Sequence, residues 1–467
     1  MTPRFGTDGL RGVAGSELTP ELTLALGRVA ARELGIPGRP FLVGRDTRRS
    51  GPLLLAALGA GLAAEGVEVV DLGVLPTPGV AALAAMRGAP AAVISASHNP
   101  FPDNGIKLFA AGGIKLGDDA EGRIEAGLAS AVAATDPPAT PVPAAGAAPT
   151  TAGKVGSAIG WVGTDADGRR RYTEQLLASL GGRRLDGLRV ALDLGNGAAT
   201  ATAADVIRAS GADLVAVLGN APDGTNINAG CGSTDPSGLA AAVVAEHADA
   251  GLAFDGDADR VIAVDAAGQI VDGDRVIALC ALDLLGRGRL AGETVVVTVM
   301  TNLGFHLAMA ERGIAVHQTP VGDRYVLEAL DRGGWSLGGE QSGHVIFRDL
   351  ATTGDGLLSG LQVLDVMARS GRTLADLAGS AMERLPQVLR NVKVTDRLAL
   401  DDAAGVWDEV RAVEAQLGSD GRVLLRPSGT EPVIRVMVEA RTEESASVAA
   451  DRLVAAVIDG LGDGVAT

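Results

Sequence analysis

Cysteine, lysine and aromatic residues are scarce in this sequence. The only two cysteines, Cys231 and Cys280, are too few for a disulfide framework or a cysteine-based zinc site. The longest apolar runs, such as residues 53–64, contain glycines and are too short to cross a bilayer, and the first residues lack the apolar core of a signal peptide. We therefore expect a cytoplasmic protein with no membrane partner.

An excess of positive charge is also missing. The chain has 40 basic and 57 acidic residues, which gives a net charge of −17. Such a charge opposes nucleic-acid binding and anchoring to anionic membranes. If the ligand is an anion, a local cluster of arginines must therefore attract it.

Hydrophobic residues are plentiful and are arranged in alternating strand and helix patterns. They make up 47% of the 467 residues, which excludes disorder of the whole chain and favours about three domains, with four within reach. Thr19, Pro20 and Gly35 predict the start and end of a first helix. The alternation predicts parallel α/β packing. Further strands are expected at 41–43, 67–72 and 91–94, and further helices at 53–65 and 80–86.

A Pro- and Ala-rich segment at 134–154, predicted to be a linker or surface excursion, interrupts this pattern. The last ~80 residues change pattern again and predict a small α+β domain. Between these two regions we expect strands at 188–193, 213–218, 251–254 and 294–300, and helices at 198–210, 237–248 and 275–285. In the last part we expect strands at 422–426 and 433–440 and a helix at 444–458.

The first chemical motif is a serine loop at residues 95–100, directly after the strand at 91–94. Ser97 on a tight loop at the carboxyl end of a strand is well placed for nucleophilic chemistry. The alternative is an ordinary Asn-Pro turn with polar capping. His98 need not be the base for Ser97, because neighbours on a loop usually diverge.

The second motif is acidic. Asp255, Asp257 and Asp259 alternate with small residues and can converge on one hard cation, which we predict to be Mg²⁺. An EF-hand loop is excluded because its twelfth position is Ala266 rather than glutamate. The alternative is a solvated acidic turn, which the apolar sequences on both sides disfavour.

Two further motifs contain glycine. Residues 338–344 present Glu340, Ser342 and His344 beside glycines, as a carbohydrate site requires, although a structural turn is an equal alternative. Residues 426–432, with Arg435 beyond, suit a phosphate dianion, although a hairpin loop is the alternative there. The Walker pattern and the dinucleotide fingerprint are absent, so nucleotide binding is not indicated.

Together and in this order, the four motifs resemble those of the α-D-phosphohexomutase superfamily. The similarity runs through nearly the whole chain and is strongest to the phosphoglucosamine branch. The tracts that also support it are residues 5–12, 97–109, 226–228, 232–234 and 353–358. The resemblance implies an α/β protein of four domains around a central cleft, three of them similar α/β domains with mixed sheets and the last a smaller α+β domain. We expect these domains at 1–153, 154–252, 253–372 and 373–467.

The resemblance also implies roles for individual residues. Ser97 would carry a phosphoryl group, and its phosphate would bind Mg²⁺ together with Asp255, Asp257 and Asp259. Glu340 and Ser342 would hold sugar hydroxyls. The phosphate that does not react would be held by Arg426, Ser428, Gly429, Thr430 and Arg435. The residues expected around the transferred phosphoryl group are Arg11, His98, Lys107, Arg260 and His344.

The implied reaction is the interconversion of glucosamine 6-phosphate and glucosamine 1-phosphate. Its activator and intermediate would be a sugar 1,6-bisphosphate, and the product would feed synthesis of UDP-N-acetylglucosamine. The expected partner is the phosphosugar alone, with the chain a monomer or a homodimer. The first alternative is a phosphoglucomutase/phosphomannomutase; a haloacid-dehalogenase-type phosphatase and a sugar-phosphate sensor also remain open.

Overall fold

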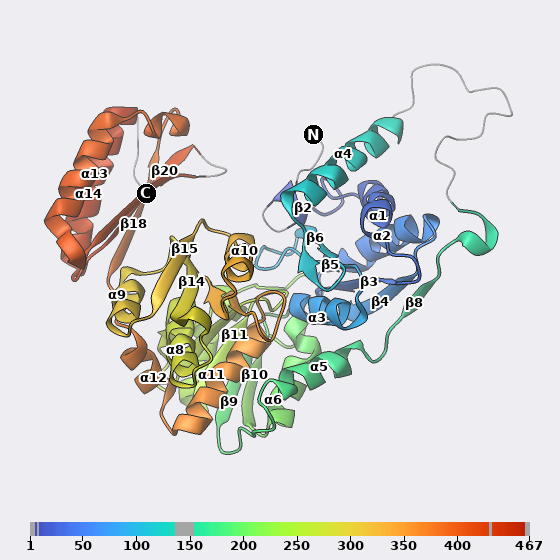
Figure 1. Ribbon diagram of the computed structural model, residues 1–467, viewed down its shortest axis with the longest axis horizontal. Helices are drawn as coiled ribbons and strands as arrows, with labels where there is room; N and C mark the ends of the chain where they lie inside the picture. The colour runs from blue at the N-terminus through green and yellow to red at the C-terminus, as the bar shows by residue number, and fades with distance from the viewer. Residues whose placement is uncertain (1–4, 7–8, 136–153, 429–431, 463–467) are drawn as a thin grey trace. The chain divides into compact units, whose positions relative to one another are not determined.

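The computed structural model describes residues 5–6, 9–135, 154–428 and 432–462 (Figure 1). Contacts divide the chain into two compact units. Unit 1 comprises residues 1–299 and 315–379, and unit 2 comprises 300–314 and 380–467. Most of the expected linker, residues 136–153, lies outside the described residues. Among the helices described, none has the length and hydropathy needed to cross a membrane.

The first sheet of unit 1 is mixed and has the order β1-β2-β6-β5-β3-β4-β8, with β7 beside β6. Strand β3 is parallel to β4 and β5, whereas β6 is antiparallel to β5 and β2. The sequence patterns did not predict β6, which places Lys107 opposite Val93 on β5. The strands are β1 Phe5–Gly6, β2 Gly9–Val13, β3 Phe41–Arg45, β4 Val69–Val74, β5 Ala91–Ile94, β6 Asp103–Ala110, β7 Ile114–Lys115 and β8 Val162–Thr164.

Helices α1, α2 and α4 pack together on one face of this sheet, and α3 contacts it at β3 and β5 (Figure 1). Helix α1 begins and ends as predicted, because the Thr19 side chain accepts from the N–H of Leu22 and Pro20 occupies the first turn. The bounds are α1 Pro20–Leu34, α2 Gly51–Ala64, α3 Thr77–Arg87 and α4 Asp118–Thr135.

Two more mixed sheets complete unit 1. Their orders are β10-β9-β11-β12-β13 and β15-β14-β16-β17. The expected helix at 198–210 is interrupted at Thr202, whose φ of −143° is not helical, so a short 3₁₀ turn precedes α6. The strands are β9 Arg189–Asp193, β10 Asp213–Leu218, β11 Ala250–Phe254, β12 Val261–Asp265, β13 Ile270–Val271, β14 Thr294–Thr298, β15 Ala315–Thr319, β16 Leu337–Gly339 and β17 Val345–Phe347. The helices are α5 Gly168–Ala178, α6 Ala203–Ser210, α7 Ser237–Ala245, α8 Gly273–Gly286, α10 Asp323–Gly333 and α11 Gly356–Ser370.

Unit 2 is built on a small antiparallel sheet of order β18-β20-β19. Its apolar core lies between this sheet and helices α13 and α14. Helix α9 Leu303–Glu311 also belongs to this unit, although it follows β14 in the chain. The other elements are β18 Gln387–Lys393, β19 Arg422–Pro427, β20 Val433–Glu439, α13 Ala404–Leu417 and α14 Glu443–Leu461; α12 Leu374–Ala381 spans the junction between the units. The expected three α/β parts and smaller α+β part are confirmed.

The structure also contains short 3₁₀ helices. Their bounds are Gly156–Ala158, Ala198–Ala201, Gly232–Thr234, Ala291–Glu293, Arg397–Leu400 and Gly418–Asp420.

Candidate active site and metal centre

The serine loop follows β5 and holds Ser97 in a strained conformation. Ser97 is 1% exposed and has a φ of +51°, a region that residues other than glycine rarely adopt. Its N–H donates to Ser95 Oγ at 2.9 Å. Its Oγ lies 3.5 Å from His98 Nδ1. The loop therefore presents the hydroxyl in one defined direction.

A buried arginine, Arg48, holds this loop in place through hydrogen bonds to its backbone. The Arg48 side chain is fully buried, and its Nε donates to Asp46 Oδ2 at 2.8 Å. Its terminal nitrogens donate to the backbone carbonyls of Ser97, Asn99, Pro100 and Asp103 at 2.6–3.1 Å. Because a guanidinium offers five donors in a rigid plane, one side chain can bond all these carbonyls and hold the loop in its strained shape.

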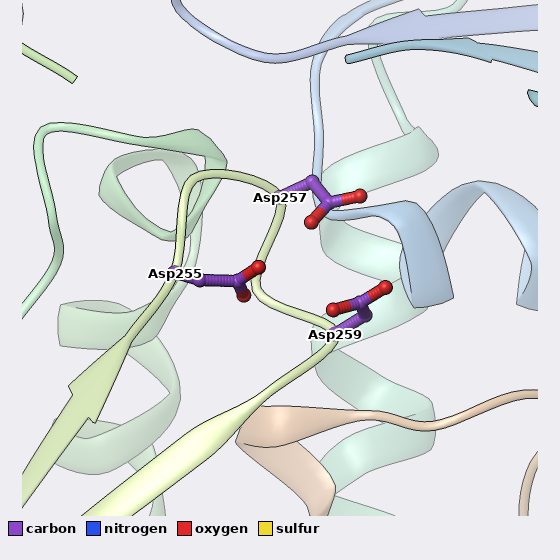
Figure 2. Close-up of side chains that lie close together, drawn as sticks. All are labelled: Asp255, Asp257 and Asp259. Atoms are coloured by element: carbon purple, nitrogen blue, oxygen red, sulfur yellow. The ribbon is translucent and has the colours of Figure 1, made fainter. Parts of the chain in front are cut away.

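Three buried aspartates lie on the loop between β11 and β12, and their carboxylates gather at one point (Figure 2). Asp255, Asp257 and Asp259 each offer an oxygen within 4.8 Å of the other two. Among the described residues, Asp257 Oδ1 and Asp259 Oδ1 have no hydrogen-bond partner. A compact set of hard oxygen ligands fits one divalent cation such as Mg²⁺. Ser97 Oγ donates to Asp255 Oδ2 at 2.5 Å, so the serine loop and this acidic loop meet.

The surroundings of the acidic cluster shift the pKa values of Asp255 and Asp259 in opposite directions. Burial, reinforced by Asp259 and Asp257, raises the pKa of Asp255 well above its usual range. Burial would also raise the pKa of Asp259, but Lys107 and His344 hold it well below its usual range. Carboxylates this close repel one another unless a cation joins them.

Cationic side chains surround the acidic loop. Lys107 Nζ, from β6, donates to Asp257 Oδ2 at 2.8 Å and Asp259 Oδ2 at 3.3 Å. His344 Nδ1 lies 3.7 Å from Asp259 Oδ2, and Arg260 Nε lies 3.9 Å from Asp259 Oδ1. Lys107 and His344 reach the acidic loop from two other parts of the chain, whereas Arg260 is the last residue of the loop itself.

His98 and Arg11 complete the expected group around Ser97. Burial, together with the positive charges of Arg260 and Arg11, lowers the pKa of His98 to about 4. His98 is therefore neutral near pH 7. Arg11, on β2, pairs in register with Gly105 on β6, two residues before Lys107.

The expected sugar-binding residues lie on the turn between β16 and β17. Glu340 Oε1 accepts from the N–H of Gly322 at 3.0 Å, and its charge acts on Arg260. Ser342 is exposed. This turn directly precedes His344, so the sugar motif and a residue beside the acidic loop belong to one hairpin.

The expected phosphate-binding residues lie in unit 2. Arg426 on β19 and Arg435 on β20 are directly opposite each other in the ladder. Burial and the charge of Arg435 lower the pKa of Arg426. Ser428 is buried, and its N–H donates to the carbonyl of Val433 at 2.9 Å. Gly429 and Thr430 lie outside the described residues.

Comparison with known families gives four matches along the chain, each to a domain of phosphoglucomutase/phosphomannomutase. They are alpha/beta/alpha domain I at residues 2–134, domain II at 170–268, domain III at 272–385 and the C-terminal domain at 389–456. A phosphoglucosamine mutase of Frankia alni is 53% identical, with 98% of each chain covered. One of Thermobifida fusca is 52% identical, with 99% of each chain covered. The chain belongs to the phosphoglucosamine mutase family.

A solved structure shares the fold of this family member. The phosphoglucomutase/phosphomannomutase family protein of Burkholderia thailandensis is 26% identical, covers 98% of each chain and superposes with a TM-score of 0.76. The expected family membership is therefore confirmed. The domain boundaries expected at 153, 252 and 372 stay predictions.

Several residues at the site of this family member received no predicted role from the sequence, although Asn228 lies in one of the tracts that carry the resemblance. Arg48 follows a buried strand, a position that could have drawn attention to it. Thr77 Oγ1 donates to Asp257 Oδ2 at 2.6 Å, and Asn228 Nδ2 donates to the carbonyl of Ser97 at 2.9 Å. Asp323 lies 3.5 Å from His344 Nε2 and forms an ion pair with Lys115. Nothing local in the sequence distinguishes Thr77 or Asp323 from ordinary helix-start residues.

Proposed function

We propose that the protein interconverts glucosamine 6-phosphate and glucosamine 1-phosphate, with Ser97 as the phosphoryl carrier. One observation carries the proposal: a strained, buried serine hydroxyl is hydrogen-bonded to a cluster of three buried carboxylates. A phosphomonoester hydrolyses extremely slowly without help, so positioning and charge neutralisation must supply the rate.

The reaction consists of two transfers. In the first, the bond from phosphorus to Ser97 Oγ breaks as a bond forms to the free hydroxyl of the sugar phosphate. The proton that this hydroxyl loses is balanced by one that Ser97 Oγ takes up as it leaves, and in the second transfer Ser97 gives a proton up while the released sugar oxygen gains one. The sugar 1,6-bisphosphate then turns over, and Ser97 Oγ takes its other phosphoryl group. Asp255 Oδ2 at 2.5 Å and His98 Nδ1 at 3.5 Å are within reach of the Ser97 proton.

The acidic loop would hold Mg²⁺ through Asp255, Asp257 and Asp259. When bound there, the ion would neutralise charge on the transferred phosphoryl group. Lys107 sits against two of these carboxylates and would serve as a proton carrier or a fixed charge. Arg11, Arg260 and His344 would stabilise the transferred group.

The remaining roles concern the rest of the substrate. Glu340 and Ser342 would hold sugar hydroxyls. Arg426, Ser428, Gly429, Thr430 and Arg435 would hold the phosphate that is not reacting. A phosphate site that accepts either end of the bisphosphate allows the intermediate to reverse without leaving. The product would supply the synthesis of UDP-N-acetylglucosamine in the cytoplasm.

The carrier role is tested by Ser97→Ala. We expect mutase turnover to fall by several orders of magnitude, because the covalent route is removed. The exposed Ser130→Ala is the matched control and should keep wild-type turnover. Intact mass of the wild type should show one phosphoryl group that Ser97→Ala lacks. Phosphate on Ser97 would also argue against a phosphatase with an aspartate nucleophile and against a sensor. Substantial turnover by Ser97→Ala would overturn the proposal.

The substrate assignment is tested separately with enzyme that is fully phosphorylated at the outset. Amino and hydroxyl groups at carbon 2 are similar in size, so discrimination by kcat/KM should be roughly 10–200-fold. If glucose 1-phosphate or mannose 1-phosphate matches glucosamine 1-phosphate, the amino-sugar assignment fails and a phosphoglucomutase/phosphomannomutase remains.

A further inference from the structure

A group of ion pairs joins the start of α4 to the start of α10. Lys115, on β7, pairs with Asp323, the first residue of α10. Arg324 Nη2 lies 2.7 Å from Asp118 Oδ1, and its Nη1 lies 3.0 Å from Glu121 Oε2, both in the first turn of α4. The Lys115 and Glu121 contacts span 208 and 203 positions of the chain. They therefore connect the region that matches domain I to the region that matches domain III.

These ion pairs are shielded from solvent. The Arg324 side chain is 11% exposed, and those of Lys115 and Asp323 are each 12% exposed. The third nitrogen of the Arg324 guanidinium, Nε, lies 3.2 Å from Glu328 Oε1 on its own helix. Ion pairs at an open surface contribute little, because water and salt screen them and both side chains stay free to move. Here each guanidinium nitrogen faces a different carboxylate, so the start of α10 is held in one position against α4.

The start of α10 also contacts the turn between β16 and β17, which carries the expected sugar-binding residues. The N–H of Gly322, just before the helix, donates to Glu340 Oε1 at 3.0 Å. Gly322 has a φ of +131°, which favours glycine. Asp323 Oδ2 lies 3.5 Å from His344 Nε2, at the end of the same turn. A displacement of the start of α10 would therefore displace Glu340.

On the other side, the ion pairs lead to the sheet that carries the serine loop. Lys115 is opposite Phe109 in the antiparallel pair of β7 and β6. Strand β6 also carries Lys107 and pairs with β5, the strand that leads into Ser97. The ion pairs thus connect two parts of the site, one with the phosphoryl carrier and one with the expected sugar ligand.

We propose that Lys115 and Arg324 are positioning residues that hold the sugar-binding turn at a fixed distance from the serine loop. Through Gly322 they keep Glu340 where it meets the sugar while the phosphoryl group of Ser97 is within reach of the sugar hydroxyl. This inference rests on the proposed mutase function, because it requires Glu340 to hold the sugar.

Sugar-phosphate binding tests the inference without turnover. Full-length Ser97→Ala cannot transfer a phosphoryl group, so calorimetric titration with glucosamine 1-phosphate and Mg²⁺ gives a Kd. Adding Arg324→Met should raise this Kd about tenfold, because Glu340 is no longer held in place. Adding Arg324→Met to a parent that also carries Glu340→Ala should change the Kd by about twofold at most, because the effect passes through Glu340. Equal losses in the two parents would overturn the inference.

Two control variants separate the connection between helices from a general loss of charge. Glu328→Gln removes a carboxylate that bonds Arg324 within α10, and it should leave the Kd unchanged. Glu121→Gln removes the partner on α4 and should raise the Kd several-fold. Arg170→Met, which removes only exposed ion pairs at and beside its own helix, should also have no effect. Equal effects of Glu121→Gln and Glu328→Gln would overturn the inference.

Steady-state kinetics of the same variants with Ser97 intact distinguish positioning from loss of folding. Arg324→Met should raise KM for the sugar phosphate more than it lowers kcat, whereas a loss of folded enzyme would lower kcat and leave KM unchanged. A change in kcat alone would overturn the inference. Failure of the Ser97→Ala parent to bind any sugar phosphate would overturn the proposed function, and this inference with it. Unchanged affinity in Arg324→Met would overturn this inference alone.

Discussion

Lys107 places a positive charge in the protein interior, beside two carboxylates. Its ammonium is almost completely buried between Asp257 and Asp259. A lysine there can offset their negative charge, and unlike arginine it can also release a proton.

Lys107→Arg separates these roles. If Lys107 transfers a proton, the variant should lose about 10²-fold or more in kcat, because a guanidinium stays protonated. The measurement is kcat at saturating substrate together with the Mg²⁺ concentration needed for half-maximal activity. Near-normal turnover would leave only the charge role.

Arg48 presents a second residue-level test, because its buried guanidinium donates to four backbone carbonyls and to Asp46. Arg48→Met should lower the free energy of unfolding by about 3–5 kcal/mol, since it leaves Asp46 as an uncompensated buried charge. Urea unfolding measures this loss. Arg208→Met removes an exposed ion pair and should change the stability by no more than about 0.5 kcal/mol. Equal losses in the two variants would contradict the assigned role of Arg48.

At the residue scale, the sequence predicts those site residues whose placement depends only on neighbouring positions in the chain. Ser97 and the three aspartates stand out because spacing alone brings them onto tight loops after buried strands. Thr77 bonds Asp257 across a sequence separation of 180 residues, and Arg48 reaches carbonyls 49–55 residues away. Such contacts depend on the order of strands in the sheet, which no local pattern specifies.

At the scale of elements, apolar periodicity and end signals predicted most of the helices and strands they were applied to. Helix α1 has both a capping residue and a stop. Strand β6 was missed because it begins with Asp103, Asn104 and Gly105, residues typical of turns. The helix expected at 198–210 was too long because the backbone at Thr202 departs from helical geometry, which hydropathy does not reveal.

The start of α11, which Asp355 caps by accepting from the N–H of Leu358, has a measurable pH dependence. Burial raises the pKa of Asp355 to about 6 in the folded protein, above its ordinary value of 3.8. The folded state therefore binds more protons than the unfolded state between these values, so this group's contribution to stability is lost as pH rises from about 4 to about 6. Asp355→Asn cannot ionise. We expect its stability relative to the wild type to increase by about 2–3 kcal/mol between pH 4 and pH 7.

Thermal denaturation across this pH range measures the difference between Asp355→Asn and the wild type. A difference that stays constant with pH would contradict the raised pKa.

The arginine pair across β19 and β20 predicts an anion dependence. Like charges directly opposite each other in a ladder are destabilising, so an anion between them should stabilise the sheet. Millimolar phosphate should raise the melting temperature of the wild type more than that of Arg426→Met.

The same variant, Arg426→Met, should raise KM for the sugar phosphate more than it lowers kcat. Chloride at equal ionic strength controls for screening, and an equal shift with both salts would contradict a phosphate site.

At the scale of the whole molecule, unit 2 takes in a segment from the middle of the chain. Glu439 is fully buried and bonds Asn302 Nδ2 at 3.2 Å, the N–H of Leu303 at 2.9 Å and Arg422 Nε at 3.0 Å. Patterns read along the sequence show where elements begin and end. They cannot show that residues 300–314 pack with partners more than a hundred positions later.

A fragment of residues 380–467 should accordingly fold poorly. It keeps the core between the sheet and α13 and α14 but loses two donors to the buried Glu439 carboxylate, at about 1–3 kcal/mol for each unmet bond. A fragment with residues 300–314 joined to its N-terminus by a Gly/Ser linker should melt at a higher temperature. Circular dichroism compares the two, and equal melting temperatures would show that the segment contributes nothing to unit 2.

The interleaved chain path of unit 2 has a consequence for recombination between relatives. A chimera made with one crossover near residue 380 inherits Asn302 from one parent and Glu439 from the other, although the two side chains share a hydrogen bond. A chimera with crossovers at 299, 314 and 379 keeps both from the same parent. Shuffled libraries should therefore retain more folded members when the crossovers respect these three points, and substitutions at positions 302 and 439 should be inherited together.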